Sequence, residues 1–269
     1  VYKDLPRVDI DNQITQNFTD VKKWKFAFNL KTPETWHEEA GAVIKAKLTS
    51  RGGHYSPVNA SYKYQTLNHF ASVNEAGYGI TLSNRDCYFM QLGNSSLSSL
   101  DETSNTLNVL AGGRAIMPNR GIVNQDGDKL FNQSFAISTH TAFNKATEMK
   151  LALEHQNPLA TGTVTGESGN YPEAIYSYLT VTDPNVLLWA LKPAEEGYAD
   201  RGIIARVWNL DSKASKSNIL FHNNIAEAYQ TSHVETDISV NPYSGSYLTT
   251  SIPAQGMNTY RVKFSSALK

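Results

Sequence analysis

Cysteine and charge are both scarce in this sequence. Cys87 is the only cysteine in 269 residues, which excludes a disulfide within the chain. Lysine, arginine, aspartate and glutamate together make up 18% of the residues, and the formal net charge is −1. This balance gives no electrostatic basis for binding nucleic acid or an anionic membrane surface. The sequence therefore predicts no nucleic-acid partner and no membrane partner.

Long hydrophobic runs are also missing. No apolar stretch approaches the roughly 20 residues that a membrane-spanning helix needs. The first residues, 1–13, contain no hydrophobic region of the kind found in signal peptides. The single cysteine is compatible with a cytoplasmic protein, and the compartment stays open at this stage.

Motifs that carry catalysis are absent as well. None of the seven histidines is spaced as a zinc-binding pair on a helix, and there is no HExxH or GxSxG motif. Gly112-Gly113 is not followed by the lysine and hydroxyl residue of a phosphate-binding loop. Cys87 lies in an apolar run, which is typical of a small buried side chain. The sequence therefore predicts no catalytic residue, no metal ligand and no cofactor bound by this chain.

Alternating apolar and polar residues mark strands along most of the chain. In 22–30, Trp24, Phe26, Phe28 and Leu30 alternate with lysine, alanine and asparagine, the pattern of a half-buried strand. The same reasoning predicts further strands over 40–48, 59–73, 130–137, 175–181, 186–191, 203–210, 219–222, 233–240, 247–252 and 257–264.

Two apolar runs around a short polar turn predict a β-hairpin over 78–92, and the Ser/Asn/Gly-rich segment 93–120 is predicted to be largely loop. Segment 141–155 fits either a short amphipathic helix ending at Asn157-Pro158 or a coil followed by a strand. The shortage of helices excludes parallel βαβ units. An all-β chain of antiparallel sandwiches is the predicted fold class.

The stretch from Trp189 to Leu210 is predicted to form a strand, an exposed loop and a second strand. Longer strands precede it and shorter ones follow, which places a domain boundary near 183–192. Glu195 and Glu196 in the loop could be paired catalytic acids, but adjacent glutamates do not impose the separation across a sugar that glycosidases need, so exposed loop charge is the favoured interpretation. As residues of the domain junction, Arg206 is expected to pair with a carboxylate and Asn209 to end the strand.

The densest group of potential ligands is Trp36-His37-Glu38-Glu39. A metal site would need donors from elsewhere, of which His54 is the nearest, and a solvated turn with one buried aromatic residue is the favoured interpretation. A lyase or hydrolase using His54 and Tyr55 is a third hypothesis. Four tyrosines in polar loops could stack on sugar rings or only cover apolar surface: Tyr55, Tyr171, Tyr198 and Tyr243.

Three stretches resemble the C-terminal β-region of glycoside hydrolase family 38, the α-mannosidases. One is Glu39-Ala-Gly-Ala-Val with the later segment Leu67–Asn84, and another is Phe135–Pro158. The most specific is Leu-Lys-Pro-Ala-Glu-Glu-Gly at 191–197, followed by Arg-Val-Trp-Asn at 206–209. The resemblance extends from about residue 7 to residue 264.

The resemblance implies a large galactose-mutarotase-like super-sandwich over 1–188 and a small β-sandwich over 189–269. In family 38 the aspartate nucleophile and the zinc ligands lie in an N-terminal α/β domain and a helical bundle, and no residue here matches those motifs. The chain is therefore expected to be a non-catalytic region, inactive alone, with zinc in a catalytic domain outside it.

The partners implied are the catalytic α/β and helical domains and a mannose-containing glycan, and a homo-oligomer stays open. If residues of this chain touch substrate, the candidates are His37 and Glu38 or His54 and Tyr55, of which only one pair is expected to face the cleft. A free-standing carbohydrate-binding β-sandwich module is the alternative function.

Overall fold

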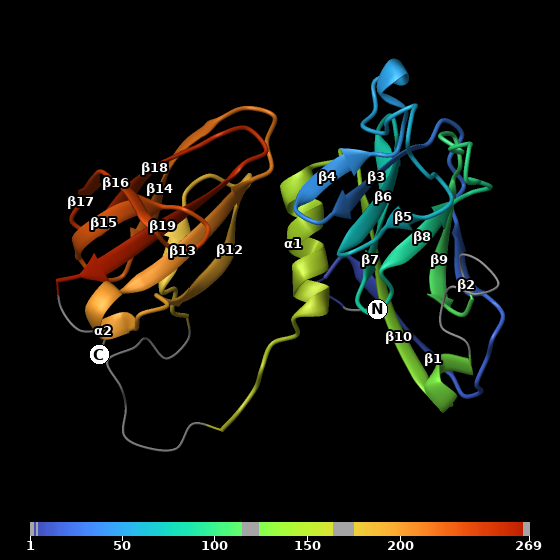
Figure 1. Ribbon diagram of the computed structural model, residues 1–269, viewed down its shortest axis with the longest axis horizontal. Helices are drawn as coiled ribbons and strands as arrows, with labels where there is room; N and C mark the ends of the chain where they lie inside the picture. The colour runs from blue at the N-terminus through green and yellow to red at the C-terminus, as the bar shows by residue number, and fades with distance from the viewer. Residues whose placement is uncertain (1–2, 4, 115–123, 164–174, 266–269) are drawn as a thin grey trace. The chain divides into compact units, whose positions relative to one another are not determined.

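The chain forms two compact units, Val1–Leu159 and Ala160–Lys269, each built almost entirely of strands (Figure 1). The computed structural model describes residues 3, 5–114, 124–163 and 175–265. Every ladder between the named strands is antiparallel, which confirms the predicted all-β class. No helix in these ranges is long and apolar enough to cross a membrane.

The first unit is a sandwich of two sheets. The larger sheet has six strands in the order β1-β10-β7-β6-β3-β4, and the smaller has four in the order β2-β9-β8-β5. The bounds of the larger sheet's strands are β1 Arg7–Ile14, β3 Glu34–Glu39, β4 Ala42–Lys45, β6 Phe70–Glu75, β7 Tyr78–Asn84 and β10 Phe131–His140. Those of the smaller sheet are β2 Lys22–Ala27, β5 Gln65–Thr66, β8 Phe89–Leu92 and β9 Thr106–Gly112.

Side chains from both sheets form the core of the first unit. Leu82 and Phe135 of the larger sheet pack in one cluster with Met90 and Leu107 of the smaller, and all four are fully buried. The Phe26 ring meets the Phe135 ring edge to face, with centroids 5.1 Å apart. The period-two alternation thus sets the inner face of each sheet, because successive side chains of a strand point to opposite faces.

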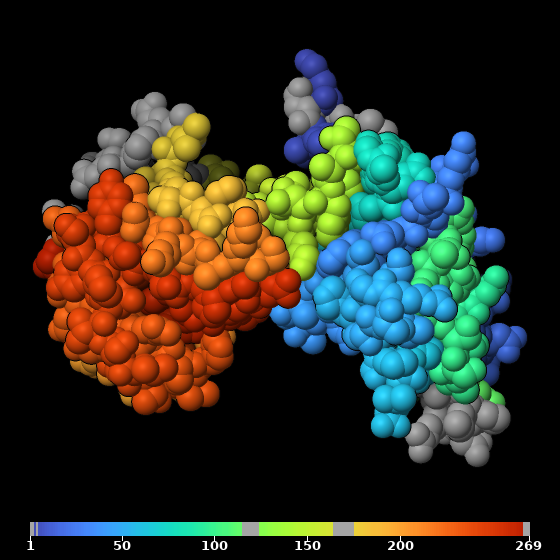
Figure 2. All heavy atoms as spheres, turned by 90° about the horizontal axis from the view of Figure 1, so that it is seen from above, coloured from blue at the N-terminus to red at the C-terminus, as the bar shows by residue number. Residues whose placement is uncertain are grey.

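Helix α1 (Lys145–Gln156) packs on the larger sheet, where it contacts β6, β7 and β10. The Asn144 side chain caps its first turn by accepting a hydrogen bond from Thr147 N at 2.9 Å. Ala146, Met149 and Ala152 are buried. Figure 2 shows the helix as a yellow-green ridge beside the blue β3–β4 part of the same unit. The helical alternative for this segment is therefore confirmed.

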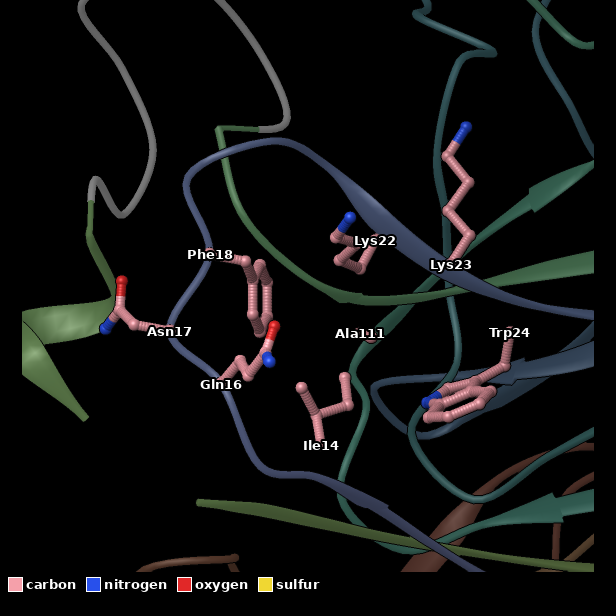
Figure 3. Close-up of a pocket in the computed structure, with 8 residues that line it drawn as sticks. All are labelled: Ile14, Gln16, Asn17, Phe18, Lys22, Lys23, Trp24 and Ala111. Atoms are coloured by element: carbon pink, nitrogen blue, oxygen red, sulfur yellow. The ribbon is translucent and has the colours of Figure 1, made fainter. Parts of the chain in front are cut away.

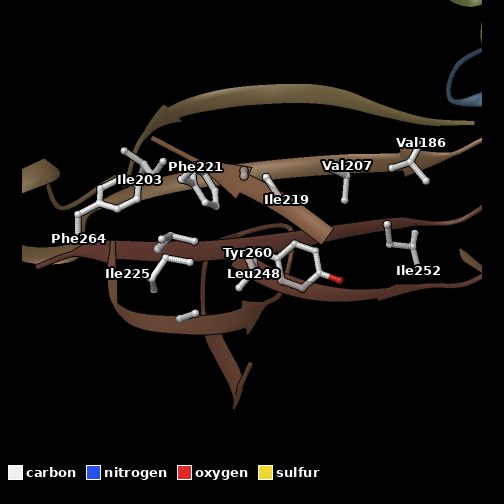
Figure 4. Packing of buried hydrophobic residues seen from close by; sticks show 13 residues of the cluster. Val186, Ile203, Val207, Ile219, Phe221, Ile225, Leu248, Ile252, Tyr260 and Phe264 are labelled. Atoms are coloured by element: carbon white, nitrogen blue, oxygen red, sulfur yellow. The ribbon is translucent and has the colours of Figure 1, made fainter. Parts of the chain in front are cut away.

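The second unit is a smaller sandwich of a five-stranded and a four-stranded sheet, in the orders β12-β13-β19-β15-β16 and β11-β14-β18-β17. Val207 and Tyr260 of the five-stranded sheet pack with Ile219 and Leu248 of the other (Figure 4). The strands are β11 Leu179–Val181, β12 Val186–Pro193, β13 Ile203–Asn209, β14 Ser215–Phe221, β15 Ile225–Thr231, β16 Asp237–Val240, β17 Tyr243–Ser244, β18 Tyr247–Ile252 and β19 Met257–Phe264; a short helix, α2, spans Tyr198–Arg201.

The hairpin predicted over 78–92 is wrong. β7 and β8 belong to different sheets, and β7 instead forms a hairpin with β6, with Glu75 opposite Tyr78. Buried Asn84 redirects the chain, because its side chain accepts a hydrogen bond from Cys87 N at 2.9 Å and donates one to Leu67 O at 2.8 Å. The segment 93–120 was predicted to be largely loop, but it contains β9, a central strand of the smaller sheet.

The boundary between the two units lies earlier in the chain than the sequence predicts. The expected boundary at 188/189 falls within β12, and the structure divides the chain between Leu159 and Ala160. The reason is strand pairing: β11 pairs with β14 and β12 pairs with β13, so β11 and the whole of β12 belong to the sheets of the second unit.

A buried charged cluster ties four elements of the second unit together. The Arg261 side chain on β19 is 5% exposed and forms two hydrogen bonds with the Asp237 carboxylate on β16, at 2.9 and 2.8 Å. Its guanidinium also lies 4.5 Å from the ring centroid of Tyr229 on β15, and it donates to the carbonyl of Arg201 in α2. A two-pronged pair of this kind fixes geometry as well as neutralising the buried charge.

We expect Asp237→Asn to destabilise the second unit by on the order of 2 kcal/mol, because it leaves the buried Arg261 charge uncompensated. Hydrogen bonding to Arg261 lowers the pKa of Asp237. A carboxyl with a lowered folded pKa stabilises the fold above its unfolded pKa of about 4, and this contribution is lost as the pH falls through the folded pKa. Urea unfolding at neutral and at progressively acidic pH, followed by tryptophan fluorescence, measures both effects.

Glu227→Gln is the matched control. Glu227 lies 3.9 Å from Arg261 but its side chain is 51% exposed, so the change should stay within about 0.5 kcal/mol. Equal acid sensitivity in the Asp237→Asn variant and the unmodified protein would contradict the assignment.

Candidate functional site

The sequence-predicted residues His37 and Glu38 lie inside β3 and are buried, at 0% and 1% exposure. The solvated turn predicted for this segment is therefore wrong, because β3 pairs with β4 on one side and β6 on the other. The Glu38 carboxylate accepts hydrogen bonds from Gly41 N at 3.0 Å and interacts with His69 Nδ1 at 2.8 Å. Neither side chain presents a surface to a substrate in this unit.

His37 and Tyr55 lie together, although the sequence placed them at separate turns. The two side chains meet at 3.0 Å, between His37 Nε2 and the Tyr55 hydroxyl. After β4 the chain turns through a single 3₁₀ turn, Thr49–Arg51, and Tyr55 returns to bridge Leu48. Burial lowers the pKa of His37 to about 4, so the ring is neutral at physiological pH, and burial raises the pKa of Tyr55.

His54 takes part in a separate cluster around Trp36. Its Nδ1 accepts a hydrogen bond from Lys45 N at 2.9 Å, and its ring lies 5.7 Å from the Trp36 ring. Phe143 stacks on Trp36 at 5.4 Å, and the Lys145 ammonium lies 4.9 Å from the same ring centroid. The Trp36 ring is thus occupied by neighbours of its own unit.

The described loop tyrosines mostly do not present an exposed ring on which a sugar could stack. Tyr55 and Tyr198 are half-buried, whereas Tyr243 is 39% exposed and its hydroxyl donates to Ala226 O. Tyr171 lies outside the described residues.

The residues expected at a domain junction all lie within the second unit. Glu195 and Glu196 are exposed in the β12–β13 connection, and Glu196 pairs with Arg201 at 2.8 Å. Arg206 was expected to pair with a carboxylate, but it donates to Thr259 Oγ1 at 3.0 Å and His233 O at 2.7 Å.

Asn209 ends β13, as expected, and is fully buried. Its amide donates to the carbonyls of Lys213 at 2.8 Å and Pro253 at 3.0 Å. It holds a turn within the second unit.

A cavity of about 340 Å³ lies at the edge of the first unit, between the β1–β2 connection and the β2–β9 ladder (Figure 3). We call it the Trp24 pocket. Figure 3 shows Ile14, Gln16 and Phe18 reaching into it from one side and Trp24 from the other. Its lining residues are Ile14, Gln16, Asn17, Phe18, Lys22, Lys23, Trp24 and Ala111.

An irregularity in the β2–β9 ladder forms one wall of the Trp24 pocket. Lys22 pairs with Gly112 and Lys23 pairs with Leu110, so Ala111 is an extra residue in β9. Such a bulge bends a strand and redirects its neighbouring side chains. It accounts for three consecutive residues of β2, 22–24, all lining one cavity, which regular alternation would not allow.

Side-chain hydrogen bonds hold the Trp24 pocket in shape. Gln133 on β10 accepts a hydrogen bond from the Trp24 indole and donates to Ala111 O at 2.8 Å. The Asn17 amide donates to the carbonyls of Asn124 and Asp128, at 2.8 and 2.6 Å.

The Phe18 ring packs against Gly112. If residue 112 carried a Cβ, that atom would lie 3.2 Å from two carbons of the Phe18 ring. Gly112, at φ +145°, therefore allows the ring to approach the backbone closely.

Two polar side chains of the Trp24 pocket are unused. Gln16 and Lys22 are exposed and have no side-chain partner within the part of the chain that the structure describes. Burial and the nearby Lys63 ammonium lower the pKa of Lys23, which contacts the Gln91 amide. Sequence reasoning missed this site, because the bulge joins β2 to the distant strand β9 and Gln133 bonds Trp24 across 109 positions, which leaves no local pattern.

Two further cavities, of about 360 and 590 Å³, flank helix α1. Both include Arg7, which forms an ion pair with Asp9 at 2.7 Å. The larger one also includes Arg85 and His155, and His155 Nδ1 meets Ser83 Oγ at 2.8 Å. Across the described ranges, no three His, Cys, Asp or Glu side chains converge as metal ligands do.

The stability of the first unit should decrease as the pH falls from about 6.5 to 4, because unfolded His37 binds a proton there that the folded ring does not. His37→Asn is expected to lower stability at pH 7 but to give a shallower decrease, by up to about 1.4 kcal/mol per pH unit. Urea unfolding between pH 4 and 7 measures the slope. His222→Asn, in the second unit, is the control, and an unchanged slope in His37→Asn would refute the assignment.

No protein-family model matches the chain, and no curated protein sequence matches it. Solved structures do match, and two of them each have a TM-score of 0.71 and 14% identity over 97% of this chain. One is an α-mannosidase from Enterococcus faecalis and the other a protein of glycosyl hydrolase family 38 from the same organism. The chain spans only 28% and 29% of their lengths. At this identity the match shows a shared fold, and it confirms the fold that the sequence resemblance implied.

Proposed function

We propose that this chain is the non-catalytic β-region of a larger retaining α-mannosidase. The observation that carries the proposal is the fold match, which covers 97% of this chain, and so both of its units, yet less than a third of each matched structure. A fold alone does not determine function. The sequence resemblance adds support. Its most specific stretches, 191–197 and 206–209, lie in the end of β12 with the following loop and in β13.

In this function the chemistry belongs to domains outside this chain. A retaining glycosidase needs two carboxyl groups about 5 Å apart across the scissile bond. Glu195 and Glu196 do not supply them, because both lie exposed on one connection and Glu196 is paired with Arg201. The catalytic α/β and helical domains would hold the nucleophile and the zinc, and this region would support them and partly line the cleft for a mannose-containing glycan.

The reading frame upstream of Val1 is expected to encode an α/β domain with a His-X-Asp zinc motif and a helical bundle. The purified chain alone should not cleave a nitrophenyl α-mannoside, whereas the longer product should, and a chelator should abolish that activity. Turnover by the purified chain that survives chelation and further purification would contradict the proposal, as would an upstream frame without such domains.

A free-standing carbohydrate-binding module is the second candidate, and the Trp24 pocket favours it. The two functions differ in the partner they require. The accessory region should bind a separately produced catalytic portion tightly, and a free-standing module should not. Analytical ultracentrifugation of the mixed chains separates the two outcomes.

A further inference from the structure

We propose that the Trp24 pocket binds a monosaccharide that carries a negative charge, such as a uronic acid or a phosphorylated hexose. The proposal stands on the pocket alone. It holds whether the chain works within a glycosidase or by itself, so it neither requires nor tests the accessory role.

The shape and walls of the pocket suit a single small ring. Its volume of about 340 Å³ lies at the lower end of the range for small-molecule sites. Ile14, Phe18, Trp24 and Ala111 supply apolar surface, and Gln16 places an amide among them (Figure 3). A pyranose ring has an apolar C–H face and a hydroxyl edge, so one face can pack on the aromatic walls while the edge bonds the amide.

The charges of the pocket favour an anion. Lys22 and Lys23 both line it, and none of the eight lining residues that the structure describes is acidic. Lys23 already contacts Gln91, whereas Lys22 has no partner among the described side chains. A carboxylate or phosphate on the sugar would give the Lys22 ammonium a charge-assisted hydrogen bond, while a cation would meet a like charge there.

The pocket is also organised before any ligand binds. Trp24 and Ala111 are both held by Gln133, and Asn17 by two backbone carbonyls. Holding these walls in place reduces the ordering that binding would otherwise require. Gln16 and Lys22 have no side-chain partner among the described residues, so these two groups can bond a ligand. The cavities beside α1 differ, because oppositely charged residues line them together and Arg7 and Asp9 already pair.

Isothermal titration calorimetry with the full chain tests the proposal, using glucuronate, mannose 6-phosphate and methyl α-mannoside. Both anionic sugars should bind more tightly than the neutral one, and their affinity should fall with added salt. If only glucuronate or only the phosphate binds, that identifies the source of the charge. The indole N–H resonance of Trp24, assigned with Trp24→Phe, should shift on binding.

Lys22→Gln should weaken binding of the anionic sugars about tenfold, the value of one charge-assisted hydrogen bond, and bring them level with methyl α-mannoside. Gln16→Ala should weaken all three sugars. Lys25→Gln is the matched control, because Lys25 lies on the same strand, is exposed and does not line the pocket. Both tested side chains are exposed, so thermal unfolding should show that each variant remains folded.

Equal affinity for charged and neutral sugars would overturn the charge assignment. No saturable binding, or binding that Lys22→Gln and Lys25→Gln weaken equally, would overturn the site. Neither result would bear on α-mannosidase activity of a longer product, so failure here is distinguishable from failure of the accessory role.

Discussion

Burial of one face of each sheet against a second sheet is the constraint on which both units depend. An antiparallel sheet with one apolar face is stable only when that face is covered. Each unit covers it with a partner sheet, and the alternation of side chains along the strands supplies the interlocking core. The outer face of the larger sheet in the first unit carries hydroxyl residues instead, including Ser72, Thr81 and Ser83, all fully buried. Helix α1 covers part of it, and His155 of the helix bonds Ser83.

The sequence predicted strand positions better than strand partners. Alternation over 22–30 and 257–264 predicts extended segments, and β2 and β19 lie there. In β2 it also reports burial, whereas Thr259 and Arg261 on the polar positions of β19 are buried as well. The same alternation is present whether two runs form a hairpin or cross to separate sheets, so β7 and β8 were wrongly joined. The switch depends on buried Asn84, whose side chain bonds both Cys87 and Leu67, and the alternation of apolar residues does not reveal these bonds.

Candidate residues were harder to predict than strands, because burial decides what a polar side chain can do. His37 and Glu38 resemble exposed ligands in the sequence, yet tertiary structure places them inside β3 with internal partners. The Trp24 pocket shows the reverse: its residues were not predicted as a site, yet they line a cavity. Lys22 and Gln16 look like ordinary surface residues, yet both line one cavity, where an extra residue in β9 places Lys22 beside Trp24. Such irregularities are set by pairing across the sheet, so a local pattern does not reveal them.

The shared fold at 14% identity is physically reasonable. A two-layer sandwich requires apolar side chains of about the right size on alternate positions, and many sequences meet that requirement. Side chains outside the core are free to differ, so the fold persists while surface sites diverge.

Gln133 gives the Trp24 pocket a further property. It lies on β10 in the larger sheet, whereas Trp24 and Ala111, which it bonds, lie in the smaller sheet. The pocket is therefore intact only while the two layers keep their alignment. A ligand that binds only the aligned state stabilises that state, so a ligand in the pocket would also oppose displacement of one sheet relative to the other. A small ligand at the rim would thus act as a clasp on the whole first sandwich.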